Sequence, residues 1–227
     1  MTFRTKAIAL AATALIALPV LAACDSDDGK ASAPSAPPTV IGLAPAAVAN
    51  PPADNSVEAG FARDMKEHHA QAVDMSMIVR VQTEDEEIRS LAYDIATTQK
   101  NQEGQMFGWL DLWGLTQTTT GPPMTWMSPE GMAAMGHQMG TPGPDTPRMP
   151  GMATKAEMER LAQVKGREAE VLFLQLMIKH HAAGVAMAQD AANRATIPQV
   201  KNLAQKMVNG QTSEMDLMRD LLAKRGA

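Results

Sequence analysis

Apolar residues recur at three- and four-residue spacing along four long stretches of the chain, with polar residues between them. This period is typical of amphipathic helices that pack against a core. The pattern predicts helices over about residues 56–81, 84–114, 154–193 and from 196 to near the C-terminus. The sequence has no alternating runs rich in β-branched residues, which would indicate strands. The chain is therefore expected to be all-α.

Capping signals set the expected ends of these helices. Thr83 is followed three residues later by Glu86, and Thr154 by Glu157, which is the spacing of a capping box. The first signal separates the first two helices, and the second opens the third helix, in which Gly166 is a weak point. Thr196 is expected to cap the last helix.

The segment 116–153 interrupts the helical pattern. Glycine and proline are too frequent there for a long regular element. Seven of the 18 methionines and one of the five histidines lie in this segment. Two helical hairpins joined by so long a connection pack most simply as a four-helix bundle, and one long crossover gives the ferritin-like form of that architecture.

The two predicted hairpins contain an internal duplication at a constant offset of 112 residues. Each copy has a phenylalanine, then a methionine, then two adjacent histidines, within residues 61–75 and 173–187. Four of the five histidines of the chain lie in these two pairs. Further residues match at the same offset, among them Glu58 with Glu170 and Gln99 with Gln211.

The repeated histidines share one helix face with methionines. Side chains three and four positions apart lie on the same side of a helix, so a thioether and two imidazoles can point toward one place from each helix. The sequence does not decide whether the two copies share one site or form two. The candidate metal ligands are Met65, His68, His69 and Met75 in the first copy, and Met177, His180, His181 and Met187 in the second.

The donor types favour copper over the other metals that helical bundles bind. Thioether sulfur is soft and suits Cu(I), and imidazole also suits copper. A di-iron carboxylate centre would need a glutamate three residues before the histidine, where this chain has Met65 and Met177. A zinc site would usually add a carboxylate or thiolate, and Asp64 could serve, but its counterpart in the second copy is Leu176. Copper is the expected metal, with Cu(I) favoured.

These residue types also have structural explanations. Methionine at helical spacing commonly fills a core, and a buried histidine can be a hydrogen-bonded structural residue. The duplication of a methionine with an adjacent histidine pair favours the metal site. Glu58 and Glu170 fit either a supporting role around the ligands or the simple placement of charge at a helix start.

A second candidate copper site lies in the long connection. Residues 132–139 hold three methionines and the fifth histidine in an open arrangement that a flexible loop could wrap around Cu(I). The alternative is a low-complexity loop in which methionine has no role. The candidate loop ligands are Met132, Met135, His137 and Met139.

The N-terminus has the features of an exported lipoprotein. Residues 1–23 combine early positive charge with an apolar run, as in a signal peptide. The run ends in Leu-Ala-Ala-Cys, which resembles a bacterial lipobox with Cys24 as the lipidated residue. The alternative is an uncleaved anchor, but the run is short for a spanning helix. Residues 24–55 are expected to form a disordered Pro- and Ala-rich tether, and residues 56–225 the bundle.

The charge of the chain argues against one class of partner. The formal net charge is −5, and loss of residues 1–23 would remove Arg4 and Lys6 and bring it to −7. No basic block is present, so nucleic-acid binding is not expected. The expected partners are the membrane, through a lipid anchor on Cys24, and a copper-donating or copper-accepting protein.

The doubled Met-x-x-His-His segment resembles the family known as domain of unknown function 305. The resemblance covers about residues 55–225 and includes the Met149–Met152 lead-in to the second copy. It implies a ferritin-like four-helix fold, export and, for some members, copper binding or copper tolerance outside the cytoplasm. At matching positions it implicates the same eight histidines and methionines. The chain departs from the family pattern at Ala169, where an aromatic residue is usual.

The sequence thus predicts a copper-binding lipoprotein that sequesters or transfers copper in the periplasm or at the outer face of a bacterial cytoplasmic membrane. No nucleophile–base pair, phosphate loop or cofactor fingerprint is present in the sequence, so an enzyme is not expected. Two alternatives stay open. A copper-dependent redox enzyme would turn over a reductant with oxygen, and a structural or protein-interaction bundle would function without the histidines.

Overall fold

The computed structural model describes residues 50–119, 121–136 and 145–227. Every regular element in these ranges is an α-helix, as the hydrophobic pattern predicts. The helices are α1 (Val57–Gln82), α2 (Glu86–Leu112), α3 (Pro129–Ala134), α4 (Lys155–Gln163), α5 (Gly166–Arg194) and α6 (Pro198–Lys224).

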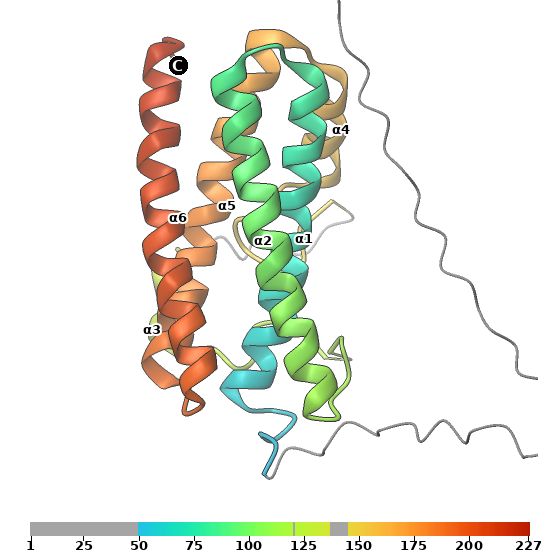
Figure 1. The fold of residues 1–227 in the computed structure, drawn as a ribbon, viewed down its shortest axis with the longest axis vertical. Helices are drawn as coiled ribbons and strands as arrows, with labels where there is room; N and C mark the ends of the chain where they lie inside the picture. The colour runs from blue at the N-terminus through green and yellow to red at the C-terminus, as the bar shows by residue number, and fades with distance from the viewer. Residues whose placement is uncertain (1–49, 120, 137–144) are drawn as a thin grey trace, which may run out of the picture. The chain divides into compact units, whose positions relative to one another are not determined.

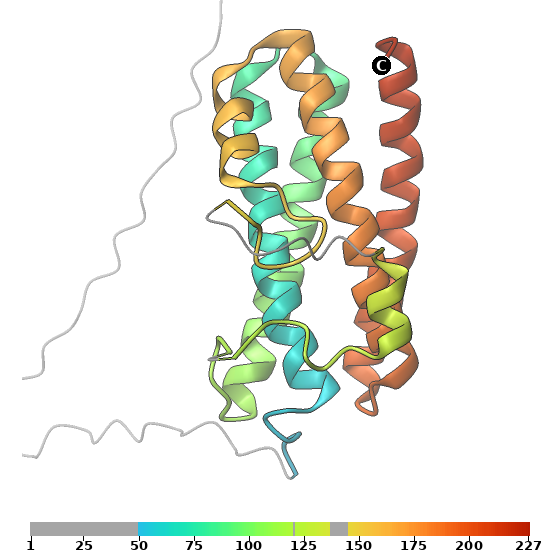
Figure 2. The ribbon, with the colours of Figure 1, turned by 180° about the vertical axis from the view of Figure 1, so that it is seen from behind.

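The four long helices form a bundle of two antiparallel hairpins (Figure 1). α1 packs along α2, and α5 packs along α6. The hairpins meet through α1 and α5, which run in opposite directions at the centre of the bundle. Figure 2 shows the face that the connection between the hairpins crosses, with the short α3 against α5 and α4 against α1. The predicted four-helix bundle with one long crossover is confirmed.

Two hydrophobic clusters fill the bundle, one on each side of the His-His level. α1 contributes Met65 to the first cluster and Met75 to the second, while α5 contributes Met187 to the first and Met177 to the second. This order follows from the opposite directions of the two helices. The largest other fully buried side chains are Phe61, Met106, Leu110 and Met149 in the first cluster, and Ile88, Ile95, Leu161, Phe173 and Leu174 in the second.

The apolar character of α5 reflects its central position. Of the helices that the structure describes, α5 alone is long and apolar enough, by length and composition, to cross a membrane. More than half of its most apolar stretch is buried inside the bundle. Burial on several sides is the reason a core helix in an α-helical bundle reads as almost continuously apolar.

The turn between α1 and α2 differs from the predicted capping box. The N-cap of α2 is Asp85, whose carboxylate accepts a hydrogen bond from the backbone N–H of Ile88 at 3.0 Å. Thr83 instead ends α1, and its hydroxyl accepts from the backbone N–H of Asp85. A carboxylate is the stronger acceptor and also interacts favourably with the helix dipole. The second helix therefore begins at Glu86, two residues later than predicted.

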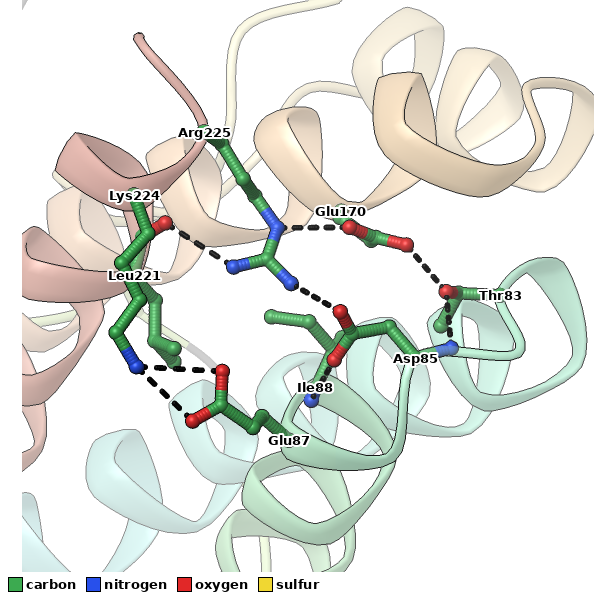
Figure 3. A network of polar contacts seen from close by, with 8 residues as sticks. All are labelled: Thr83, Asp85, Glu87, Ile88, Glu170, Leu221, Lys224 and Arg225. Atoms are coloured by element: carbon green, nitrogen blue, oxygen red, sulfur yellow. Dashed lines mark hydrogen bonds and ion pairs between the residues drawn. The ribbon is translucent and has the colours of Figure 1, made fainter.

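A buried network joins this turn to the opposite hairpin (Figure 3). Arg225, just after α6, donates from Nε to Glu170 at 2.7 Å and from Nη2 to Asp85 at 2.7 Å. The Thr83 hydroxyl donates to the second oxygen of Glu170. Glu170 of α5 thus holds the α1–α2 turn in place.

Glu58 makes the corresponding connection from the first hairpin. Its carboxylate accepts from the backbone N–H and the hydroxyl of Thr196, at 2.6 and 2.9 Å, in the α5–α6 turn. The prediction that Thr196 caps α6 was therefore wrong. That position belongs to Ile197, which makes no side-chain capping bond. Glu58 and Glu170 each hold the turn of the other hairpin, and neither is hydrogen-bonded to one of the four paired histidines.

The third predicted helix is divided into α4 and α5. The capping box of Thr154 and Glu157 is present in full, but α4 ends at Gln163 and α5 begins at Gly166. Gly166 has a φ of +54°, a left-handed conformation that interrupts a helix and that glycine adopts at little cost. The prediction of one long helix was wrong, and the break of two residues falls directly before Gly166, the weak point of the predicted helix.

Two buried aspartates hold the first part of the connection against the bundle. Asp64 of α1 accepts from the backbone N–H of Met124 at 2.6 Å and from Trp126 Nε1 at 2.8 Å. Asp190 of α5 accepts from the backbone N–H and the hydroxyl of Ser128, at 3.0 and 2.6 Å. Burial raises the pKa of Asp64 despite these donors. Asp64 is thus engaged with the connection and not with the histidines.

Gly60→Ala is expected to destabilise the bundle by roughly 1–3 kcal/mol, the usual cost of overpacking. A Cβ at this position would lie 2.4 Å from Cγ and Cδ1 of Trp126, so the indole would have to move away from Asp64. Denaturant unfolding followed by circular dichroism measures the change. Gly104→Ala is the matched control, because nothing lies within 4 Å of a Cβ there and alanine favours the helix. An equal loss in the control would contradict this explanation.

Candidate metal centre

The four paired histidines lie fully buried at the middle of the bundle. The rings of His68 on α1 and His180 on α5 stack with their centroids 3.7 Å apart and their planes at 30°. His180 also donates from Nε2 to the backbone carbonyl of His68, 3.0 Å away. These two residues, equivalent in the duplication, make the central contact between the hairpins.

The other histidine of each pair turns toward the second helix of its own hairpin. His69 Nε2 donates to the amide oxygen of Gln102 on α2 at 2.8 Å. His181 Nε2 donates to a carboxylate oxygen of Glu214 on α6 at 2.7 Å. Gln102 and Glu214 are separated by the same 112 residues as the histidines they contact. The two hairpins therefore repeat this geometry with a different acceptor.

Three of the four rings are held in one tautomer. Amide oxygens, backbone carbonyls and carboxylates accept hydrogen bonds but do not donate them, so Nε2 carries the proton in His69, His180 and His181. In a neutral ring, Nδ1 then carries the lone pair. None of these three Nδ1 atoms has a hydrogen-bond partner, and neither ring nitrogen of His68 has one. Five buried ring nitrogens are thus left without partners.

Burial keeps the rings of His68, His69 and His180 neutral. It lowers the pKa of His68 and of His180 well below the ordinary value of 6.5, and neighbouring histidines lower the pKa further by repulsion. Burial likewise lowers the pKa of His69 to about 4, although the hydrogen bond to Gln102 acts in the opposite direction. At neutral pH these three histidines therefore offer lone pairs, which is the form in which imidazole binds a metal.

The four candidate methionines are fully buried beside the histidines: Met65 and Met187 in the first hydrophobic cluster, Met75 and Met177 in the second. Thioether sulfur thus lies on both sides of the His-His level. Within the described ranges, no three His, Cys, Asp or Glu side chains come together where they could hold a metal ion. The residues present fit a metal that takes imidazole nitrogen together with thioether sulfur, as copper does, better than a cage of imidazoles and carboxylates.

Two buried glutamines line the same level. Gln99 and Gln211, equivalent in the duplication, are almost fully buried, and neither amide atom of either residue has a hydrogen-bond partner. The amide oxygen of Gln211 lies against Gly184, 2.4 Å from where a Cβ would stand, and the His68 ring is 3.3 Å from the same point. The absence of a side chain at Gly184 therefore makes room for an amide beside the central imidazole.

The connection covers the seam between α1 and α5 near this level. Gln71 of α1 bonds both backbone groups of Ala153, at 2.9 and 2.6 Å. Gly151, with a φ of +80°, lies so close to Ala183 of α5 that a Cβ would approach it to 2.4 Å. Figure 2 shows this part of the connection crossing the two helices. The segment helps to shield the histidines from solvent.

The candidate loop ligands are only partly described. Met132 and Met135 are half-buried against the first hydrophobic cluster. Other methionines of the connection, Met124, Met127 and Met149, are buried in that cluster and serve as core. His137 and Met139 lie outside the described residues, as does Cys24, so the loop site and the lipid anchor stay predictions.

Sequence reasoning missed Gln102 and Glu214. Each lies 33 residues after the histidine it contacts, and both occupy the same position of the duplication. A search for polar residues at matching positions of the second helices could have found them. Their different chemistry concealed the match, because an amide and a carboxylate do not read as one repeated residue.

Comparison with known proteins gives the family of the chain. The family model described as domain of unknown function (DUF305) matches residues 58–222. A DUF305 protein from Streptomyces coelicolor that is thought to be secreted is 53% identical, with a TM-score of 0.68, and the match covers 77% of this chain and 97% of that one. A DUF305 fragment from Deinococcus radiodurans is 32% identical, with a TM-score of 0.59 and coverage of 77% and 99%.

A more distant solved structure shares the fold. CopM in its Cu(I)-bound form has a TM-score of 0.53 at 20% identity, and the match covers 74% of this chain and 96% of CopM. No curated protein matches the chain. The family model spans most of the described bundle, and both DUF305 structures align over nearly their whole length. The chain therefore belongs to the DUF305 family.

Proposed function

We propose that this protein binds copper outside the cytoplasm and sequesters it or passes it on. Cu(I) would be held at the middle of the bundle by histidine nitrogen and methionine sulfur. The candidate ligands are those of the duplicated segments: His68, His69, His180 and His181 with Met65, Met75, Met177 and Met187.

The unpartnered ring nitrogens carry this proposal. A buried polar group without a partner costs about 1–3 kcal/mol, and five such nitrogens belong to the paired histidines of α1 and α5. A purely structural histidine would use its ring nitrogens in hydrogen bonds. A bound metal ion would accept a lone pair from these rings, at most one from each neutral imidazole, and would turn part of this cost into binding energy.

The chemistry of the neighbouring groups favours Cu(I) among the metals that bind imidazole. The additional donors at this level are thioethers, which are neutral and soft. The only cysteine is Cys24, which precedes the bundle helices. These helices therefore supply no thiolate ligand. A soft monovalent ion needs less negative charge from its ligands than Zn²⁺ or Fe²⁺ does.

Related structures support a role in copper handling. CopM, which shares the fold, has been solved in Cu(I)-bound, Cu(II)-bound and Ag-bound forms. Ag⁺ is a soft monovalent ion like Cu(I). The similarity to the Streptomyces coelicolor protein supports export.

The proposal also covers location and partners. Residues 1–23 would direct export, and a lipid on Cys24 would anchor the bundle to the membrane through the tether of residues 24–55. A second protein would then donate copper to this site or accept copper from it. The role is binding rather than catalysis.

X-ray absorption at the copper K-edge tests the ligand set. Protein loaded with one equivalent of Cu(I) is expected to show both nitrogen and sulfur neighbours around copper. The spectrum is expected to stay the same when Met132, Met135 and Met139 are replaced by leucine and His137 by glutamine. A shell of sulfur alone that disappears in this loop variant would contradict the proposal and place copper in the connection.

A further inference from the structure

The duplication is broken at one polar position beside the histidines. His69 and His181 both donate from Nε2 to the second helix of their own hairpin, over 2.8 and 2.7 Å. The acceptor is the neutral amide of Gln102 on α2 but the carboxylate of Glu214 on α6. The geometry is shared, so the two acceptors differ by one negative charge.

Glu214 is the one carboxylate, among the residues that the structure describes, with a hydrogen bond to any of the four paired histidines. Its side chain is 25% exposed, while His181 is fully buried. The other acids on the central helices are committed elsewhere. Asp64 holds the connection, and Glu58 and Glu170 hold the interhelical turns. Glu214 is therefore the carboxylate placed to act on the histidine level through a direct hydrogen bond.

The equivalent position on α2 carries no such charge. Gln102 lies in a groove of about 460 Å³ between α2 and α6. The groove is lined by uncharged residues and one cation: Thr97, Thr98, Asn101, Gln105, Leu203 and Lys206. Lys206 adds positive charge near Gln102, and the carboxylate bonded directly to one of the paired histidines is Glu214.

We propose that Glu214 sets the charge of the cation that the histidines accept. A cation in a poorly solvated interior needs a counter-charge, and a carboxylate transmits its charge to a metal through the histidine it holds. One carboxylate balances one monovalent ion, Cu(I) or Ag(I), and leaves a divalent ion with an unbalanced charge. This inference rests on the proposed copper site and adds to it a specificity-determining residue.

The duplication offers its own controls for a test. Four proteins are compared: the wild type, Glu214→Gln, Gln102→Glu and the exchanged double variant with both changes. Affinities for Cu(I) and Cu(II) are measured by competition with chelators of known affinity, and circular dichroism follows folding. Glu214→Gln keeps an acceptor for His181 and removes only the charge.

The expected results follow from the number of carboxylates. Glu214→Gln should weaken Cu(I) binding by about tenfold or more, as loss of a residue that supports a metal ligand commonly does. Gln102→Glu should raise Cu(II) affinity relative to Cu(I) by about tenfold or more, since a second carboxylate favours the divalent ion. The exchanged variant should return to the wild-type ratio, because one carboxylate remains at an equivalent position.

Two failures are distinguishable. Wild-type protein that binds neither ion would overturn the proposed function itself. Copper binding in the wild type with the same ratio of Cu(I) to Cu(II) affinity in all four proteins would overturn the role of Glu214 and leave the copper site standing. A purely structural role for Glu214 would lower both affinities in Glu214→Gln without recovery in the exchanged variant, which also contradicts the inference.

Discussion

Replacing His68, His69, His180 and His181 together with leucine is expected to abolish tight Cu(I) binding. The variant removes every imidazole from the middle of the bundle and leaves thioethers as the only donors. The Cu(I) affinity should fall by more than the roughly 100-fold that removal of a residue supporting a metal ligand can cost. Copper retained per protein after gel filtration of a sample loaded with one equivalent of Cu(I) measures the effect, with wild-type protein in parallel.

The same variant is expected to stay folded without metal and to be more stable than the wild type. Leucine fills a similar volume, and the change removes five buried ring nitrogens that have no partner, each at a cost of about 1–3 kcal/mol. Gln102 and Glu214 are partly exposed, so water can replace their lost donors. A folded variant that retains copper like the wild type would show that the histidines are not the ligands.

Acid is expected to destabilise the metal-free protein between pH 6.5 and about pH 4. The pKa of His69 falls to about 4 in the folded state, and those of His68 and His180 lie well below 6.5, because burial disfavours the charged ring. In this range the unfolded chain binds protons that the folded chain does not. The contribution of these histidines to the free energy of unfolding is therefore complete above pH 6.5 and is lost as the pH falls. Each histidine contributes at most about 1.4 kcal/mol per pH unit, and His69 about 3 kcal/mol in total.

Denaturant midpoints of metal-free protein at pH 7.5, 6.5, 5.5 and 4.5 measure this loss. The variant with four leucines is the control, because it keeps every carboxylate of the bundle and lacks the paired histidines. Its stability should change much less over the same interval. An equally steep decline in both proteins would assign the effect to carboxylates and contradict the account of buried neutral histidines.

The long helices could be predicted from sequence because each buries one continuous apolar stripe. The face that holds Met65, His68 and Met75 could be predicted for the same reason, since residues three and four apart on a helix must lie together. Duplication at a constant offset then placed the second set on α5. The burial of all eight candidate ligands agrees with this expectation.

Other features depend on how the hairpins meet, which local sequence does not encode. Thr83 and Thr196 read as helix caps, but each contacts a glutamate of the other hairpin: Glu170 for Thr83 and Glu58 for Thr196. The left-handed φ of Gly166 divides a helix whose apolar pattern continues.

The polar surroundings of the histidines were hidden for a related reason. The roles of Gln102 and Glu214 require knowing that His69 and His181 point toward α2 and α6, away from the central seam. Helical periodicity gives the face on which a residue lies, but it does not give the rotamer that the side chain adopts. Sequence therefore indicated the buried candidate ligands more readily than the polar groups that contact them.

The measurement that tests the copper site most directly is a Cu(I) titration against a chromogenic chelator, run on three proteins. These are the wild type, the variant with leucine at His68, His69, His180 and His181, and the loop variant with Met132, Met135 and Met139 replaced by leucine and His137 by glutamine. The bundle site predicts that the wild type and the loop variant compete equally well and that the variant with four leucines does not compete. Competition that survives the loss of the four histidines and disappears in the loop variant would contradict it.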